Sequence, residues 1–125
     1  MFARQIALAG LLVGSATASV AAQDFSVVAE RDAFVTMLEG KDLRLGLLGI
    51  TLVVAPDGTI AGEAMGWPIT GTWEWIDGAF CREMDWGGKP IVYNCQLVET
   101  RGGRDMRFTV DRGAGESATF RMRDR

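Results

Sequence analysis

Residues 71–96 read GTWEWIDGAFCREMDWGGKPIVYNCQ, and this stretch predicts two consecutive β-hairpins. The first turn is the pair Asp77-Gly78, in which glycine accepts the positive φ that a two-residue hairpin turn requires. The second turn is Gly87-Gly88-Lys89-Pro90, where glycine and proline again interrupt the chain. Between the turns, apolar and polar side chains alternate, as they do in a strand with one buried face. We therefore predict strands at residues 72–76, 79–86 and 91–99.

The spacing of the two cysteines agrees with the second hairpin. If Gly88 is its centre, Cys81 and Cys95 lie directly opposite each other. Opposed Cα atoms of antiparallel strands are about 4.5–5.5 Å apart, a separation that a disulfide can bridge. The closed loop has 15 residues, and such a loop stabilises a fold by about 3 kcal/mol in the chain-entropy model. We therefore expect a disulfide between Cys81 and Cys95.

The remaining chain extends this pattern into a mainly β domain. Residues 30–39 predict one helix, because Phe34, Met37 and Leu38 fall on one face and Gly40 stands at a natural C-cap. Pro68 is expected to end a strand or to mark a sheet edge. Further strands are predicted at residues 43–45, 50–54, 59–65, 104–110 and 117–123. The expected fold is an antiparallel meander of about eight strands, either a small barrel or a curved sheet, with the N-terminal helix over one end.

The first 22 residues predict an export signal that is removed. Arg4 precedes an uncharged, mostly apolar run at residues 6–13, and Val20-Ala21-Ala22 provides a small-x-small cleavage pattern. Cleavage after Ala18 is an alternative. The apolar run is shorter than the ~20 residues that a membrane-spanning helix needs. We therefore expect a periplasmic or secreted protein without a membrane span, with a single domain at residues 23–125.

Composition excludes several function classes. The chain has no histidine, which removes His-based general bases, Ser-His-Asp and Cys-His pairs and His-ligated metals. The glycine pairs at residues 102–103 and 113–115 lack the spacing of nucleotide-binding loops, so no cofactor is indicated. Residues 23–99 hold five basic and twelve acidic residues, whereas residues 100–125 hold seven and four. An exported, net acidic protein is a poor nucleic-acid binder, and the arginines near the C-terminus suit a solvated sheet face or an anionic contact.

One face of the two hairpins predicts a candidate ligand site. It is the more aromatic face and is therefore expected to point inward, with the carboxylates of Glu74, Glu83 and Asp85 on the outer face. An inward Arg82 is unusual, because a buried guanidinium needs a partner. The functional interpretation is a barrel mouth that reads an anion, lined by Trp73, Trp75, Arg82, Trp86 and Asn94. The structural alternative is that Arg82 pairs with a carboxylate such as Glu63.

Four short motifs carry a family resemblance: Gly71-Thr72-Trp73-Glu74-Trp75, Gly78-Ala79-Phe80-Cys81-Arg82, Asn94-Cys95-Gln96 and Asp111-Arg112-Gly113-Ala114-Gly115. With them the chain resembles a family of small exported bacterial proteins of unknown function, from Phe34 onward. The resemblance implies a compact β domain with a disulfide and supplies no catalytic residues. Some members carry the label dihydrodipicolinate reductase, which implies a Rossmann domain and NAD(P)H. This chain has neither the length nor the nucleotide fingerprint for that activity.

Three functions remain open at this point. The first is a binding module that holds a small amphipathic or anionic ligand in the barrel. The second is a periplasmic interaction or inhibitor module that contacts an envelope protein, through exposed arginines or residues 111–116, and whose barrel is filled. The third is an enzyme that uses carboxylates alone, which requires two acidic side chains in one cleft; Glu63, Glu74, Glu83 and Asp85 are the candidates.

Overall fold

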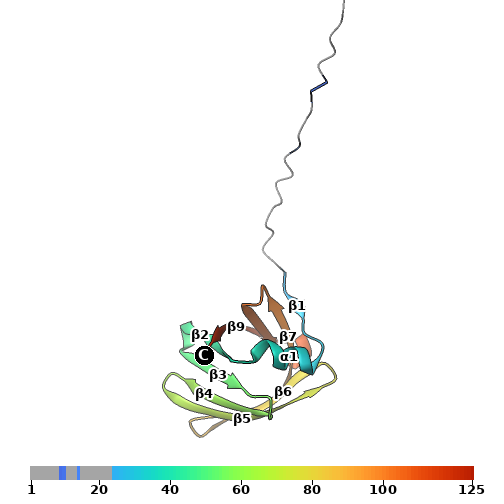
Figure 1. Ribbon diagram of the computed structural model, residues 1–125. Coiled ribbons are helices and arrows are strands. Elements are labelled where there is room, and N and C mark those ends of the chain that lie inside the picture. The colour runs from blue at the N-terminus through green and yellow to red at the C-terminus, as the bar shows by residue number, and fades with distance from the viewer. Residues whose placement is uncertain (1–8, 11–13, 15–23) are drawn as a thin grey trace, which may run out of the picture.

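The computed structural model describes residues 9, 10, 14 and 24–125 of the chain. The predicted export signal at residues 1–22 lies outside the described residues, apart from Ala9, Gly10 and Gly14. The described part forms one domain of strands with one α-helix (Figure 1). Its elements are β1 (Ser26–Val27), α1 (Arg31–Leu38), β2 (Lys41–Leu45), η1 (Gly46–Leu48), β3 (Ile50–Val54), β4 (Thr59–Ala64), β5 (Trp67–Ile76), β6 (Ala79–Trp86), β7 (Lys89–Arg101), β8 (Asp105–Thr109), η2 (Asp111–Gly113) and β9 (Ser117–Asp124).

Strands β2 to β9 form a closed antiparallel barrel. Each strand pairs with the next one along the chain, and β9 returns to pair with β2, where Leu43 opposes Met122. The mainly β meander barrel with one N-terminal helix is therefore confirmed. The short strand β1, which the sequence pattern did not predict, pairs with the end of β7 through Ser26 and Thr100. Its two residues are exposed and show no alternation of their own.

The two predicted hairpins are present, with one change of register. Ile76 opposes Ala79, and Cys81 opposes Cys95, with which it forms a disulfide; their Cα atoms are 3.9 Å apart. The second turn, however, is the two-residue Gly87-Gly88, because Trp86 opposes Lys89. The prediction that Gly88 is the centre of this hairpin gives the correct strand pairs up to Arg82–Asn94. Between Met84 and the turn, however, the pairs are shifted by one residue, and the prediction is wrong there. A β-bulge restores the register, since two residues of β7, at 92 and 93, lie opposite the single residue 83 of β6.

The strand predicted at residues 59–65 does end before Pro68, at Ala64, but Pro68 itself lies within the next strand and not in a turn. It is the second residue of β5 and opposes Glu63 of β4. The pairing of β5 with β6 begins one residue later, at Ile69. A proline, which has no backbone N–H, is tolerated there because Pro68 is not paired with β6 and so need not donate a hydrogen bond to that strand. Its carbonyl instead accepts a hydrogen bond from the Gly87 N–H at 2.9 Å.

Two glycines allow the barrel wall to bend sharply. A Cβ at Gly62 would stand 2.0 Å from the Thr51 carbonyl oxygen, and one at Gly71 would stand 2.4 Å from the Glu83 carbonyl oxygen. Neither space can hold a side chain, so only glycine lets the neighbouring strands approach this closely.

The two ends of the barrel differ. Helix α1 is followed by β2, so it lies at the end that carries the turns at residues 55–58, 77–78 and 102–104; we call this the capped end (Figure 1). The other end, the open end, carries η1, the turn at residues 65–66, the turn at residues 87–88 and the loop at residues 110–116. In the described part of the chain, no helix combines the length and apolar character needed to cross a membrane.

Aromatic side chains fill the capped end. Phe34 of α1 is fully buried, and its ring centroid lies 5.4 Å from that of Trp73, 5.0 Å from Trp75 and 5.2 Å from Phe80. The ring of Phe80 in turn lies 5.4 Å from that of Phe108. Such contacts join the helix to strands on opposite sides of the barrel, and each aromatic pair adds about 0.5–1.5 kcal/mol beyond area burial.

Candidate functional site

A cavity of about 310 Å³ occupies the barrel between this aromatic cluster and the open end. That volume lies at the lower limit of the range for small-ligand sites, about 300–1,000 Å³. Most of its wall is apolar, with Leu43, Leu52, Phe80, Phe108 and Phe120 among the lining residues. Polar groups enter at a few points, from Arg82, Gln96, Glu116 and Ser117. An apolar wall with a few polar groups is the usual composition of a ligand pocket.

Arg82 is the charged group inside the barrel. Its residue is 8% exposed, and its Nη1 donates a hydrogen bond to the Val92 carbonyl oxygen at 2.6 Å. Val92 belongs to the bulge of β7, so the register shift places this acceptor within reach of the guanidinium. Within the described residues no carboxylate forms an ion pair with Arg82. Glu63, the carboxylate suggested as its structural partner, is exposed on β4.

The guanidinium of Arg82 keeps unused hydrogen-bonding capacity. Burial lowers the pKa of Arg82 from its ordinary value, because desolvation penalises the charged form. Arginine nevertheless remains protonated in proteins. Among the described side chains, no buried nitrogen or oxygen lacks a hydrogen-bond partner. The donors of Arg82 that do not bind Val92 are therefore not sealed in the interior, and Arg82 is among the residues that line the cavity.

Trp73 and Trp75, two of the predicted site residues, belong to the capped end. The Trp73 indole N–H donates to the Ala55 carbonyl oxygen at 2.8 Å, and the Trp75 indole N–H donates to the Ala29 carbonyl oxygen at 3.1 Å. Neither side chain lines the cavity. The guanidinium over the Trp73 ring is that of Arg31, 5.1 Å from the ring centroid, and not that of Arg82. These two tryptophans hold the helix against the barrel.

Trp86 and Asn94 also lie outside the cavity lining. The Trp86 indole N–H donates to the Ala64 carbonyl oxygen at 2.9 Å, which joins β6 to β4. The Asn94 side chain instead fixes the loop after β8: its Nδ2 donates to Asp111 Oδ1 at 2.8 Å, and its Oδ1 accepts from the Asp111 N–H at 3.0 Å. Of the five predicted residues, the structure places only Arg82 at the cavity.

Several cavity residues were missed as site residues by the sequence pattern. Gln96, Phe108 and Phe120, which were not proposed for the site, all line the cavity. Alternation could not show that they lie near Arg82, because β9 reaches that region only when it pairs with β2. Glu116 and Ser117 precede or begin β9, where no sequence signal marks a ligand site.

The carboxylates suggested for catalysis lie on the outer surface. Glu74 and Glu83 are exposed and, together with Trp73, line an outer groove of about 410 Å³ beside Asp57 and Cys81. Hydrogen bonds from the hydroxyl and the backbone N–H of Thr59 hold the pKa of Asp57 below its usual value. A general acid needs a raised pKa, so Asp57 is tuned in the opposite direction. Within the described residues, no three potential ligands cluster as a metal site would require.

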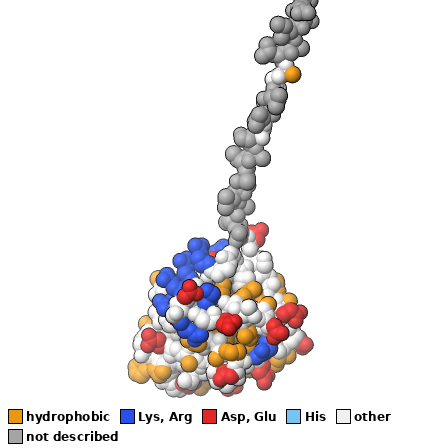
Figure 2. Space-filling model, viewed as in Figure 1, with side chains coloured by type: hydrophobic (Ala, Val, Ile, Leu, Met, Phe, Trp, Pro, Cys, Tyr) orange, Lys and Arg blue, Asp and Glu red, His pale blue; other side chains and the backbone are white. Residues whose placement is uncertain are grey.

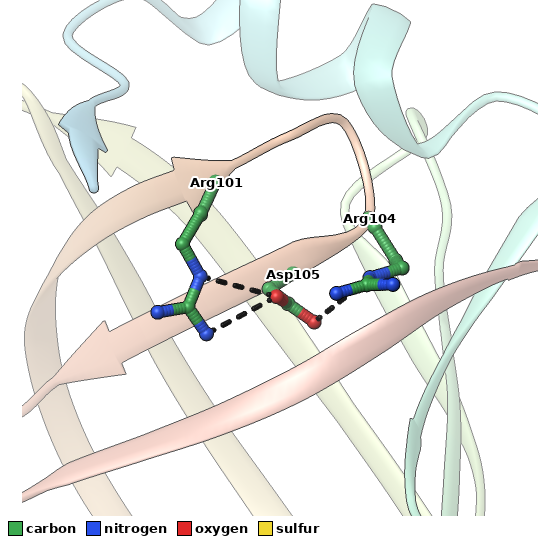
Figure 3. Close-up of polar contacts among 3 residues, drawn as sticks. All are labelled: Arg101, Arg104 and Asp105. Atoms are coloured by element: carbon green, nitrogen blue, oxygen red, sulfur yellow. Dashed lines mark hydrogen bonds and ion pairs between the residues drawn. The ribbon is translucent and has the colours of Figure 1, made fainter. Parts of the chain in front are cut away.

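Six of the seven arginines near the C-terminus divide into two groups, and the seventh, the exposed Arg112, donates to the Ile76 and Asp77 carbonyls. In the first group, Arg101 and Arg104 flank the buried Asp105 (Figure 3), and Arg107 pairs with Glu99 at 2.9 Å. The second group consists of Arg121, Arg123 and Arg125, which are exposed and make no ion pair within the described residues. Basic side chains gather on one part of the surface in the space-filling view (Figure 2). Two of the second group, Arg121 and Arg123, belong to β9, where they oppose Asp105 of β8 and Asp42 of β2.

Known proteins offer no direct guide to these features. Comparison with protein-family models, with curated proteins and with solved structures finds no match to this chain. The site must therefore be interpreted from its own geometry, which is a largely apolar barrel cavity with one buried guanidinium in its wall.

Proposed function

We propose that the protein is an exported binding module whose barrel holds a small amphipathic ligand with an acidic head group. The observation that carries the proposal is Arg82, a buried cation that lines the cavity and has no carboxylate partner in the described chain. A buried charge is costly unless it is paired. An acidic ligand group would supply the missing negative charge.

The rest of the cavity selects the remainder of the ligand. A carboxylate suits the planar guanidinium, which can donate two parallel hydrogen bonds to it. The walls formed by Leu43, Phe108 and Phe120 favour an aliphatic or aromatic body. Glu116 also lines the cavity and disfavours a second anionic group. A volume of about 310 Å³ suits a single short chain or ring and not a two-chain lipid.

The compartment is part of the proposal. The disulfide, with Cys81 only 1% exposed, is compatible with an oxidising environment. The first 22 residues carry the pattern of an export signal. Together they support a periplasmic or secreted protein.

The cavity also bears on the choice among the three functions that the sequence left open. An interaction or inhibitor module predicts a filled barrel, so a cavity of this size favours ligand binding. An enzyme with two carboxylates predicts that both enter one cleft. Glu116 is the only acidic residue among those that line the barrel cavity. Glu74 and Glu83 do share the outer groove with Asp57, but the pKa of Asp57 is lowered there, whereas a general acid needs a raised pKa. The reductase label gains no support, since the described chain has no βαβ unit for a dinucleotide.

Titration with decanoate, followed by calorimetry, tests the proposal on the oxidised protein. We expect wild type to bind decanoate and to bind the neutral analogue decanol at least tenfold more weakly. Arg82→Met should weaken decanoate binding about 10- to 100-fold, because a hydrogen bond to a charged group contributes about 1.5–3 kcal/mol. Arg112→Met is the matched control, since Arg112 is exposed, donates to the Ile76 and Asp77 carbonyls and is not among the residues that line the cavity.

Two results would contradict the proposal. The first is equal affinity of wild type and Arg82→Met for decanoate. The second is an unliganded native mass spectrum of the protein from the periplasm together with no binding of decanoate or of octanoate. A mass 2 Da below that of the reduced chain, expected for one disulfide, would verify that the tested sample is correctly oxidised.

A further inference from the structure

Gln96 of β7 is a second polar side chain that is buried in the cavity wall. Its residue is 8% exposed, like Arg82, and it lines the cavity. Within the described residues, the Gln96 amide takes part in no side-chain hydrogen bond, although such an amide can donate two and accept two. Because no sealed side-chain nitrogen or oxygen there lacks a partner, the amide is not sealed in the interior. It therefore keeps its hydrogen-bonding capacity for a molecule in the cavity.

The strand register places Gln96 beside Arg82. Gln96 opposes Phe80, and Arg82 opposes Asn94, two residues before Gln96 on β7. Arg82 and Gln96 are therefore diagonal neighbours on the same face of the hairpin. The Cα atoms of such neighbours are about 7–8 Å apart in a regular antiparallel pair, a separation that long side chains can span. One small head group in the cavity can thus reach both side chains.

The Gln96 amide needs a different partner from the guanidinium of Arg82. A guanidinium only donates hydrogen bonds and a carboxylate only accepts them, so these two groups satisfy each other. The amide also carries an acceptor, Oε1, which a carboxylate cannot satisfy. Among the lining residues, the Ser117 hydroxyl is already engaged with that of Thr109 at 2.7 Å. A ligand that displaces water must therefore supply a donor for Oε1, because an unpaired buried acceptor weakens binding.

We propose that the cavity selects carboxylic acids that carry a hydroxyl group on the first or second carbon after the carboxylate, and that Gln96 determines this specificity. The inference rests on the proposed function, since it takes Arg82 as the partner of the carboxylate. A hydroxyl group both donates and accepts, so it satisfies either end of the Gln96 amide. The apolar walls formed by Leu43, Phe108 and Phe120 then hold the hydrocarbon chain.

Calorimetric titration of the oxidised wild-type protein with three acids tests this specificity. The acids are decanoate, 2-hydroxydecanoate and 3-hydroxydecanoate, which share chain length and charge and differ only in the hydroxyl group. We expect at least one hydroxy acid to bind about 3- to 10-fold more tightly than decanoate, the gain that one neutral hydrogen bond supplies. Because this comparison uses only the wild-type chain, it does not depend on how any variant folds.

A matched pair of variants on β7 assigns the preference to Gln96. Gln96→Met keeps a side chain of similar length without polar donor or acceptor, and should reduce the affinity ratio between hydroxy acid and decanoate to about one. Tyr93→Phe is the control, because it removes a hydroxyl from the same strand at a residue that is 55% exposed and is not among those that line the cavity. It should keep the wild-type ratio. Far-UV circular dichroism and the unfolding midpoint should verify that both variants fold.

The outcomes distinguish this inference from the proposed function. Equal affinity of wild type for decanoate and both hydroxy acids would overturn the hydroxyl specificity while leaving the carboxylate site at Arg82 in place. A wild-type preference that persists in Gln96→Met would overturn the role of Gln96. No binding of any of the three acids would overturn both proposals. Arg82→Met should weaken the binding of all three acids by a similar factor, since it removes the partner of the carboxylate that they share.

Discussion

The capped end and the cavity of one barrel show two uses of the same strands. At the capped end, Phe34 is fully buried among the rings of Trp73, Trp75 and Phe80. Two residues beyond Phe80 on β6, Arg82 lines a cavity whose volume is about 310 Å³. The first region is packed to a density that stabilises the fold, and the second leaves space unfilled. The difference indicates that stability is concentrated at the capped end and that the other end is free to bind.

The largest test of this difference is Phe34→Ala. We expect a loss of about 3–5 kcal/mol in the free energy of unfolding, because the variant leaves a void where four aromatic rings meet. Phe120→Ala enlarges a cavity that already exists and should cost clearly less. Urea denaturation of both variants gives the comparison, and equal losses would mean that the two regions contribute alike.

Removal of the disulfide comes next in size. Cys81→Ser with Cys95→Ser should lower the free energy of unfolding by about 3 kcal/mol, because the loop of the unfolded chain is no longer closed. The disulfide joins β6 to β7 next to Arg82, because Cys81 directly precedes Arg82 and Cys95 directly follows Asn94, the residue opposite Arg82. Decanoate affinity should therefore fall as well, although less than in Arg82→Met. A double variant as stable as wild type would assign the hairpin's stability to the strand pairing alone.

Enlarged side chains should sharpen the comparison at a smaller scale. Val98→Leu adds volume at a fully buried site in the core and should cost about 1–3 kcal/mol. Ala118→Leu adds more volume, but beside the cavity, and should change the free energy of unfolding by less than about 1 kcal/mol. The same Ala118→Leu should weaken decanoate binding, since it occupies ligand space. A larger cost for Ala118→Leu than for Val98→Leu would show that the cavity is not free space.

The smallest expected effect is a pH dependence at the capped end. Hydrogen bonds from Thr59 lower the pKa of Asp57 in the folded state from the model-peptide value of 3.8. This carboxylate therefore stabilises the fold above pH 3.8, and the contribution is lost as the pH falls through the folded pKa. Asp57→Asn should be less stable than wild type at neutral pH and equal to it at strongly acidic pH. Urea midpoints from neutral pH downward measure this, and a constant difference would contradict the assignment.

The local part of the fold was predictable from the sequence because short-range rules apply to it. The turns at Asp77-Gly78 and Gly87-Gly88, the alternation along β6 and β7 and the cysteine spacing each concern neighbours in one hairpin. The bulge at residues 92 and 93 was not predictable, because a single extra residue leaves no mark in the alternation that precedes it. That bulge nevertheless supplies the carbonyl of Val92 that binds Arg82.

The candidate site was only partly predictable for a related reason. Arg82 stood out because its inward position conflicts with its charge, and the structure keeps it inward. The tryptophans were assigned to the same site because alternation gives the face of a strand but not the position along the barrel axis. In the structure each of the three indoles finds a carbonyl oxygen inside the fold, as buried tryptophans usually do.

The sequence by itself determined the β-hairpins, the Cys81–Cys95 disulfide, the single helix and the inward direction of Arg82. Only the tertiary structure decided that the barrel closes through β9 and β2, that the aromatic rings gather beneath α1, and that the opposite end stays hollow. The physical reason is the range of the interactions. Turn geometry and alternation act over a few residues, whereas the space left inside a barrel depends on side chains from strands that are far apart in the chain.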